Sequence, residues 1–99
     1  MNITSLSDIF TRIKNAHELN AFLKDLCTPQ ELKAMEERWR VCQLLHTEQH
    51  SYREIHDLTG ASLATITRIA RFLKDEPHGG YRLMLQRQNP KRTQLSSKK

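Results

Sequence analysis

The chain has 99 residues, of which 37% are hydrophobic and 27% are charged, and its formal net charge is +5. No segment approaches the roughly 18 apolar residues of a membrane span, and the opening MNITSLSDIF lacks the basic and long apolar regions of a signal peptide. We therefore expect a cytoplasmic protein with no membrane partner, and one short enough that oligomerisation is a reasonable expectation.

The N-terminal part of the chain predicts two short helices. Apolar residues recur there at helical spacing, with a break near Asn15. The first run is Leu6, Ile9, Phe10 and Ile13, and the second is Leu19, Phe22, Leu23 and Leu26. On a helix, each run forms an apolar stripe with polar residues on the opposite face.

A longer helix follows, and its beginning carries a clear signal. Thr28 is a candidate N-cap, Pro29 suits the first helical position, and Glu31 completes a capping box. The apolar stripe of this helix consists of Leu32, Met35, Trp39, Cys42 and Leu45. The two cysteines, Cys27 and Cys42, lie among apolar residues and are predicted to be reduced core thiols.

The stretch SYREIHDLTGASLATITRIARFLK, residues 51–74, predicts two helices joined by a tight turn. Ser51 and Glu54 form a second capping box. Gly60 can adopt the positive φ of a helix end, and Ser62 can cap the next helix. The pattern predicts buried positions at Tyr52, Ile55, Leu58, Leu63, Ile66, Ala70 and Leu73.

The chain after this stretch predicts one more short helix and a tail. Pro77 and the Gly79–Gly80 pair end the preceding helix, and YRLMLQRQ forms the last one, with Tyr81, Met84 and Leu85 facing inward. No strand pattern appears. We therefore predict an all-α fold of about six short helices, with one domain over residues 1–88, a helix-turn-helix at about 51–73 and a basic flexible tail at 89–99.

The residues of the second helix suit contact with DNA bases. A helix-turn-helix places its second helix in the major groove while the first crosses the backbone. Ala64 is small enough to meet a thymine methyl, and Thr65 and Thr67 offer hydroxyls. An ordinary helical hairpin in a bundle fits the same pattern, so the pattern alone leaves both interpretations open.

The charge distribution favours DNA. Residues 1–50 carry six Lys and Arg against seven Asp and Glu, whereas residues 51–99 carry ten against four. Tyr52 and Arg53, at the start of the first helix, are placed for phosphates, and Arg68 and Arg71 are exposed cations of the second helix. Double-stranded DNA is therefore the expected partner.

Two segments carry a resemblance to a known family. LCTPQELKAMEERWRV followed by SYREIHDLTGASLATITRIARFLK resembles the Trp repressor family, above all in ATITR at residues 64–68. The resemblance implies an intertwined homodimer whose helices before Ser51 interweave and whose residues 51–73 read a palindromic operator. It also implies DNA-facing positions, namely Tyr52, Arg53, His56, Leu63, Ala64, Thr65 and Thr67.

The chain departs from the family at the effector pocket. In the family, tryptophan lies between two arginines beside a glycine. Arg38 and Arg68 match the arginines and Thr28 a residue at the pocket edge, but Ile69 replaces the glycine and Phe72 a hydroxyl-bearing residue. These two bulky side chains would occupy the space that an indole needs. Tryptophan is therefore a doubtful co-repressor, and no other cofactor is expected. The preferred interpretation of Arg38 and Arg68 is that they pair with Glu36, Glu37 or DNA phosphate.

Two other classes of function compete with DNA binding. An enzyme is not expected, because the five histidines are scattered and no catalytic or metal-binding motif is present. A helical adaptor that binds a protein partner through the same helix remains the alternative. Its binding need not weaken steeply with salt, whereas DNA binding should.

Overall fold

The structure is a computed structural model that describes residues 2–75 and 77–88, and within these residues the regular secondary structure is entirely helical. The elements are α1 (Leu6–Phe10), α2 (Ala16–Leu26), α3 (Pro29–Thr47), α4 (Tyr52–Thr59), α5 (Leu63–Asp75) and α6 (Gly80–Gln88). The predicted all-α class with about six short helices is confirmed.

The chain forms two compact units, Met1–Ala34 and Met35–Lys99, and the division between them falls within α3. The expectation of one domain over residues 1–88 stays a prediction. The proposed basic tail, residues 89–99, lies outside the described residues.

The first unit contains α1, α2 and the beginning of α3. Ser5 and Asn15 cap α1 and α2, since their side chains accept hydrogen bonds from the backbone N–H groups of Asp8 and Glu18. The rings of Phe10 and Phe22 meet edge to face with centroids 5.7 Å apart, an arrangement that aromatic pairs prefer. Neither α1 nor α2 contains a buried residue.

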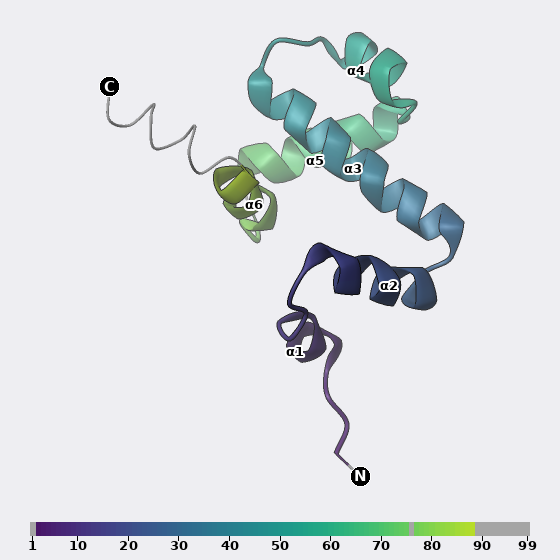
Figure 1. Ribbon diagram of the computed structural model, residues 1–99. Helices are drawn as coiled ribbons and strands as arrows, with labels where there is room; N and C mark the ends of the chain where they lie inside the picture. The colour runs from purple at the N-terminus through teal and green to yellow at the C-terminus, as the bar shows by residue number, and fades with distance from the viewer. Residues whose placement is uncertain (1, 76, 89–99) are drawn as a thin grey trace. The chain divides into compact units, whose positions relative to one another are not determined.

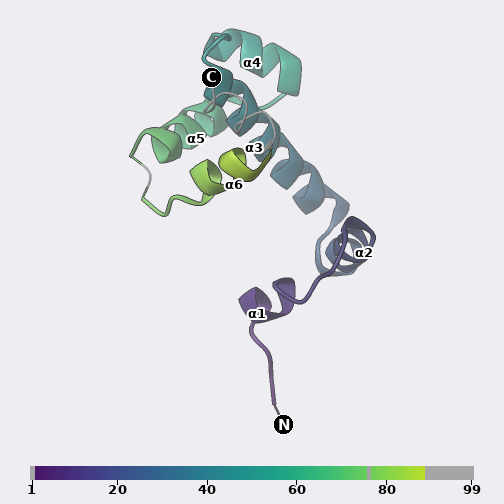
Figure 2. The ribbon, with the colours of Figure 1, turned by 60° about the vertical axis from the view of Figure 1, so that its left-hand side comes forward.

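The second unit has its core where α3, α4, α5 and α6 meet. The buried apolar residues come from all four helices and from the α4–α5 turn: Val41, Cys42, Ile55, Ala61, Ile66, Ile69, Leu73 and Leu85. Contacts join α5 to α4 and to α6, and both views show α4 near one end of α5 and α6 near the other (Figure 1, Figure 2). α5 is therefore packed against α4 near its beginning and against α6 near its end.

The two predicted capping boxes are both present. The Thr28 hydroxyl accepts from the Glu31 N–H at 3.1 Å, and the Glu31 carboxylate accepts from the Thr28 N–H at 2.8 Å. Ser51 and Glu54 make the equivalent pair at 3.1 and 2.8 Å. These bonds satisfy donors that the first turn of a helix leaves without intrahelical partners.

The buried face of the helix-turn-helix differs from the predicted one. Leu63 is 57% exposed, and Leu58 and Tyr52 are also exposed, whereas Ile69 is fully buried. The inward stripe of α5 is Ile66, Ile69 and Leu73, at intervals of three and four residues. Leu63 lies in the first turn of α5, and at that end the buried cluster is completed by the turn residue Ala61 instead.

Both cysteines are free thiols, as predicted. Cys42 is buried in the core of the second unit, and this burial raises the pKa of its thiol to about 11, although Arg82 acts in the opposite direction. Cys27 is only half-buried, so the prediction that both thiols lie in a core holds for Cys42 alone.

Candidate nucleic-acid interface

The turn between α4 and α5 has a conformation set by its sequence. Gly60 lies at φ +79°, in the left-handed region, and its N–H donates to the carbonyl of His56 at 2.8 Å. The Ser62 hydroxyl then accepts from the Thr65 N–H at 3.1 Å and so caps α5. Both predictions for this turn, the glycine and the cap, are confirmed.

Side chains of α4 hold the turn residue that lies deepest. Ala61 is only 2% exposed. Its N–H donates to the Thr59 hydroxyl at 3.1 Å, and its carbonyl oxygen lies 2.7 Å from His56 Nδ1. Thr59 in turn donates to the Ile55 carbonyl at 2.7 Å. The backbone of Ala61 is thus bonded on both sides to α4, which restricts how α5 leaves the turn.

Two arginines tie the ends of these helices to the rest of the unit. Arg40 of α3 donates through Nη2 to the Leu58 carbonyl near the end of α4, at 3.2 Å. Arg82 of α6 donates to the Leu73 carbonyl near the end of α5, at 2.6 Å. The last carbonyls of a helix have no intrahelical partner, and cations are favourable there. Sequence reasoning missed both arginines, because their partners are 18 and 9 residues away.

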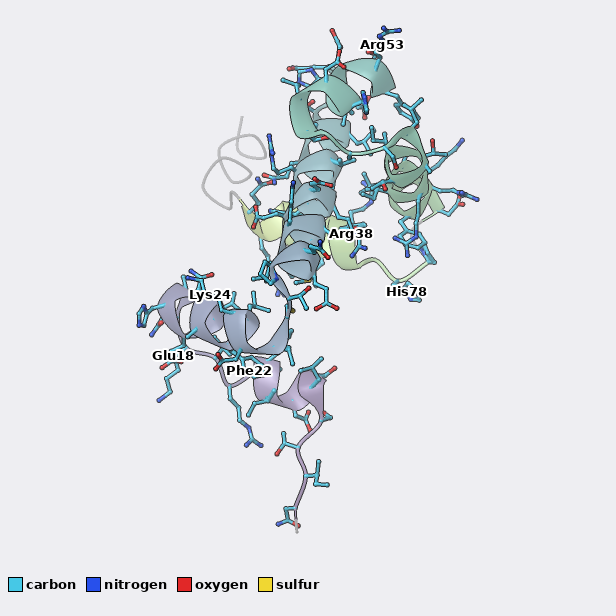
Figure 3. The ribbon with its side chains drawn as sticks, turned by 90° about the vertical axis from the view of Figure 1, so that its right-hand side faces the viewer. Glu18, Phe22, Lys24, Arg38, Arg53 and His78 are labelled. Atoms are coloured by element: carbon cyan, nitrogen blue, oxygen red, sulfur yellow. The ribbon has the colours of Figure 1, made fainter. Side chains whose placement is uncertain are left out.

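The predicted DNA-binding residues lie mostly on the surface of α4 and α5. On α4, Tyr52, Arg53 and His56 are exposed, and Figure 3 shows Arg53 projecting from the helix. On α5, the predicted residues that are exposed are Leu63, Ala64, Thr67, Arg68 and Arg71.

Thr65 differs from its neighbours on α5. It is half-buried, and its hydroxyl accepts a hydrogen bond from the Ser62 hydroxyl at 3.1 Å. Because the hydroxyl of a threonine can accept and donate at once, its own proton is still available to a ligand.

The electrostatics of α5 suit an anionic partner. The helix carries three cations, Arg68, Arg71 and Lys74, against one acid, Asp75, and its first turn contains no acidic residue. The N–H groups of a helix N-terminus also favour negative charge. The surface therefore combines a small side chain, hydroxyls and cations on one short helix, and these groups can contact base edges and phosphates.

A cavity of about 500 Å³ lies between α3, α5, α6 and the segment before α6. Its lining includes Arg38, Trp39, Arg68, Phe72, Tyr81 and Met84, and Figure 3 labels Arg38 on α3 and His78, which also lines it.

The charges and rings of this cavity interact. The Arg68 guanidinium carbon lies 4.4 Å from the centre of the Phe72 ring, within the range of a cation–π interaction. Burial raises the pKa of the Tyr81 phenol and nearby Cys42 adds to this, whereas Arg38 and Arg68 lower it. The positive charges of Arg38 and Arg68 are therefore both felt by the Tyr81 phenol.

The five residues proposed for an effector pocket are not all brought together. Arg38, Arg68 and Phe72 line the cavity. Ile69 does not line this cavity; its side chain is fully buried in the core because it lies on the inward stripe of α5, and its expected place in the indole slot of the family stays a prediction. Thr28 belongs to the other compact unit, where it caps α3.

Sequence reasoning missed Trp39, Tyr81 and Met84 as cavity residues. It treated them as core, since apolar side chains at helical spacing are the usual sign of a core. The Pro77-His78-Gly79 segment between α5 and α6 was the available signal, because it separates the two helices and lines the same cavity.

Residues 2–75 and 77–88 contain neither a metal-binding cluster nor a membrane-spanning helix. No group of three or more His, Cys, Asp or Glu residues in this part of the chain could hold a metal ion. No helix there is both long enough and apolar enough to cross a membrane.

Comparison with known proteins gives two matches. Residues 1–89 match the family model described as Trp repressor protein. The chain is also 36% identical over 86 residues to the uncharacterized protein YerC of Bacillus subtilis (strain 168), a match that covers 87% of this chain and 81% of the relative.

Proposed function

Because the chain belongs to the Trp repressor family, whose members are helix-turn-helix regulators that bind DNA, we propose that it reads a specific operator and represses transcription from it. α5 enters the major groove, and α4 crosses the backbone. In this proposal the protein acts in the cytoplasm as a regulator and not as an enzyme.

The exposed face of α5 is the observation that carries this proposal. Ala64, Thr67, Arg68 and Arg71 are exposed on a helix whose inward stripe is packed into the core. The turn before it is held by the hydrogen bonds of Ala61. A reading helix with fixed direction presents its side chains to the bases without a large cost of ordering them.

The partner that completes the protein is a second copy of the same chain. Apolar side chains of the first unit are left open to solvent, with Ile3 85%, Leu6 52%, Leu26 47% and Phe10 39% exposed. Burial of such surface is worth about 25 cal/mol per Å². A two-fold dimer would cover it and would place two copies of α5 about one DNA turn apart, opposite a palindromic operator.

The operator is bound without tryptophan. The Phe72 ring lines the same cavity as Arg38 and Arg68, and it lies under the Arg68 guanidinium. An effector shifts a conformational balance only through different affinities for the two states. With Phe72 in this position, the arrangement of α5 needs no added aromatic ring.

A helical adaptor is the second candidate, and one observation favours it. Leu58 and Leu63 are 54% and 57% exposed on the helix-turn-helix, and exposed apolar side chains are typical of protein-binding surfaces. Salt distinguishes the two functions, since DNA affinity falls with log salt at a slope of about 0.9 per phosphate contacted.

Selection of bound sequences from random duplex DNA, with and without tryptophan, tests the proposal. We expect a palindromic sequence to be enriched equally in both conditions, with binding that weakens steeply as salt rises. Enrichment of no sequence would contradict operator reading. Enrichment only with tryptophan would retain operator reading but contradict tryptophan independence.

A further inference from the structure

The hydrogen bond between His56 and Ala61 determines which ring nitrogen carries the proton. A carbonyl oxygen can only accept, so His56 Nδ1, at 2.7 Å from the Ala61 oxygen, must be the donor. In the neutral ring the other nitrogen, Nε2, is then an acceptor with a lone pair. In the charged ring both nitrogens donate, and the bond to Ala61 is kept. Protonation therefore changes Nε2 without breaking the turn.

Nε2 is the nitrogen that remains for a ligand. His56 is exposed, and within the described residues its only side-chain hydrogen bond is the one from Nδ1 to Ala61. The two nitrogens lie on different sides of the ring, so Nε2 points away from the carbonyl that Nδ1 contacts.

The charged groups closest to His56 in sequence lie on α4, and α3 contributes one arginine near the end of that helix. Arg53 and Asp57 lie on α4, three residues before it and one after it. Arg40 of α3 reaches the end of α4 at the Leu58 carbonyl. The first turn of α5 contributes no acid. Along α4, His56 therefore has one arginine, Arg53, and two acids, Glu54 and Asp57, close in sequence, and Arg40 binds a carbonyl two residues further on.

We propose that His56 has two roles in DNA binding: Nδ1 positions the reading turn through Ala61, and Nε2 donates to a DNA phosphate after taking up a proton. The proposal rests on the DNA-binding function proposed above. A phosphate diester has no proton to give, so neutral Nε2 and a phosphate oxygen would meet as two acceptors. Histidine is the side chain that changes charge between about pH 5 and 8. Binding is therefore coupled to uptake of up to one proton per subunit.

Calorimetry in two buffers of different ionisation enthalpy tests this coupling. Binding of the selected duplex is measured for the wild type, His56→Asn and His17→Asn between about pH 6 and 8.5, the range around the ordinary histidine pKa. In His56→Asn the introduced side-chain amide can still donate to the Ala61 carbonyl, but it does not titrate. His17, on α2, is the matched control outside the helix-turn-helix.

We expect the wild type and His17→Asn to take up about one proton per subunit at the alkaline end of this range, and to lose affinity there by up to about tenfold per pH unit for each subunit. His56→Asn should bind more weakly at the acidic end and take up no proton. Equal proton uptake by His56→Asn, or none by the wild type, would overturn the proposal while leaving DNA binding intact. No duplex binding by the wild type would overturn both proposals.

A second variant keeps the proposal testable if the turn between α4 and α5 does not form in His56→Asn. His56→Lys supplies a cation that remains charged throughout the range, so its DNA affinity should not fall as the pH rises. If the affinity of His56→Lys fell as steeply as that of the wild type, the titrating group would be elsewhere and the proposal would be wrong.

Discussion

At the residue scale, hydrogen bonds decide how the side chains of the reading helix are presented. The Thr65 hydroxyl already accepts from Ser62, which caps the same helix, so Thr65 both stabilises the start of α5 and remains able to donate. Ala64 and Thr67 make no such bond and are exposed. Among the candidate base contacts, the Thr65 side chain therefore has the least rotational freedom. Ala64, with the smallest side chain, would let the helix backbone come closest to a base.

We expect Ala64→Asp and Thr65→Ala each to weaken operator binding by about 1–3 kcal/mol, the usual value of one good base contact, with added repulsion from phosphates for Asp. Binding is measured by titration of the selected duplex. Gln86→Asp makes a charge change of the same sign at an exposed position of α6 and should have little effect. Unchanged affinity in both α5 variants, with melting temperatures intact, would mean that α5 is not the reader.

If the operator is bound without tryptophan, as proposed, we expect Phe72 and not Ile69 to be the side chain that excludes the indole. Ile69→Gly would empty part of the core, because Ile69 is fully buried, whereas Phe72→Ala opens the cavity itself. Calorimetric titration should show no micromolar tryptophan binding by the wild type. Phe72→Ala should bind tryptophan more tightly than the wild type if the Phe72 ring blocks the indole. Met84→Ala, which changes another lining residue, should not. Micromolar binding by the wild type, coupled to tighter DNA binding, would refute a filled cavity.

At the element scale, each helix of the reading motif has an identifiable start and end. Ser51 with Glu54 begins α4, Gly60 ends it, and Ser62 begins α5. The arginines from α3 and α6 then bond carbonyls near the C-termini of α4 and α5. Two short helices thus gain from caps and tertiary bonds the stability that isolated helices of this length lack.

Gly60→Ala should lower the free energy of unfolding by about 1–2 kcal/mol, because a side chain disfavours the left-handed conformation. Nothing lies within 4 Å of where the new Cβ would be, so the cost comes from φ alone. Gly80→Ala is the control: it begins α6, its φ is not positive, and its Cβ also meets nothing. Urea unfolding should show no decrease in the free energy of unfolding for Gly80→Ala. Equal losses for both variants would contradict the explanation.

At the scale of the whole molecule, apolar surface is distributed unevenly. The second unit has a core formed by four helices, whereas α1 and α2 bury nothing although their apolar stripes follow the helical period. Apart from the Phe10–Phe22 contact, much of this apolar surface stays open to solvent, which is explained if a second copy covers it.

We expect dissociation of the dimer to be coupled to unfolding of the first unit. The melting temperature should then rise with protein concentration, as it does when association stabilises the folded state. Sedimentation should find dimers at micromolar concentration, and Leu6→Asp should weaken association. A chain that sediments as a folded monomer under these conditions would disprove the dimer.

Local features of this protein were determined by its sequence. The capping boxes at Thr28 and Ser51, the turn glycine and the cap of α5 involve residues no more than five apart. Such interactions form within a single turn of chain, so a pattern of residue types is enough to predict them. The all-α class and the position of the helix-turn-helix follow from the same local signals.

Only the tertiary structure decided which faces turn inward and which groups meet. Helical spacing admitted Leu63 to the core, whereas the packing of α3, α5 and α6 left Leu63 exposed and buried Ile69. The bond from Arg40 to Leu58 spans 18 residues, and the cavity joins Arg38 to Arg68 and Tyr81. The reason is physical: a stripe has a width of several residues, and the neighbouring helices select which of them are buried.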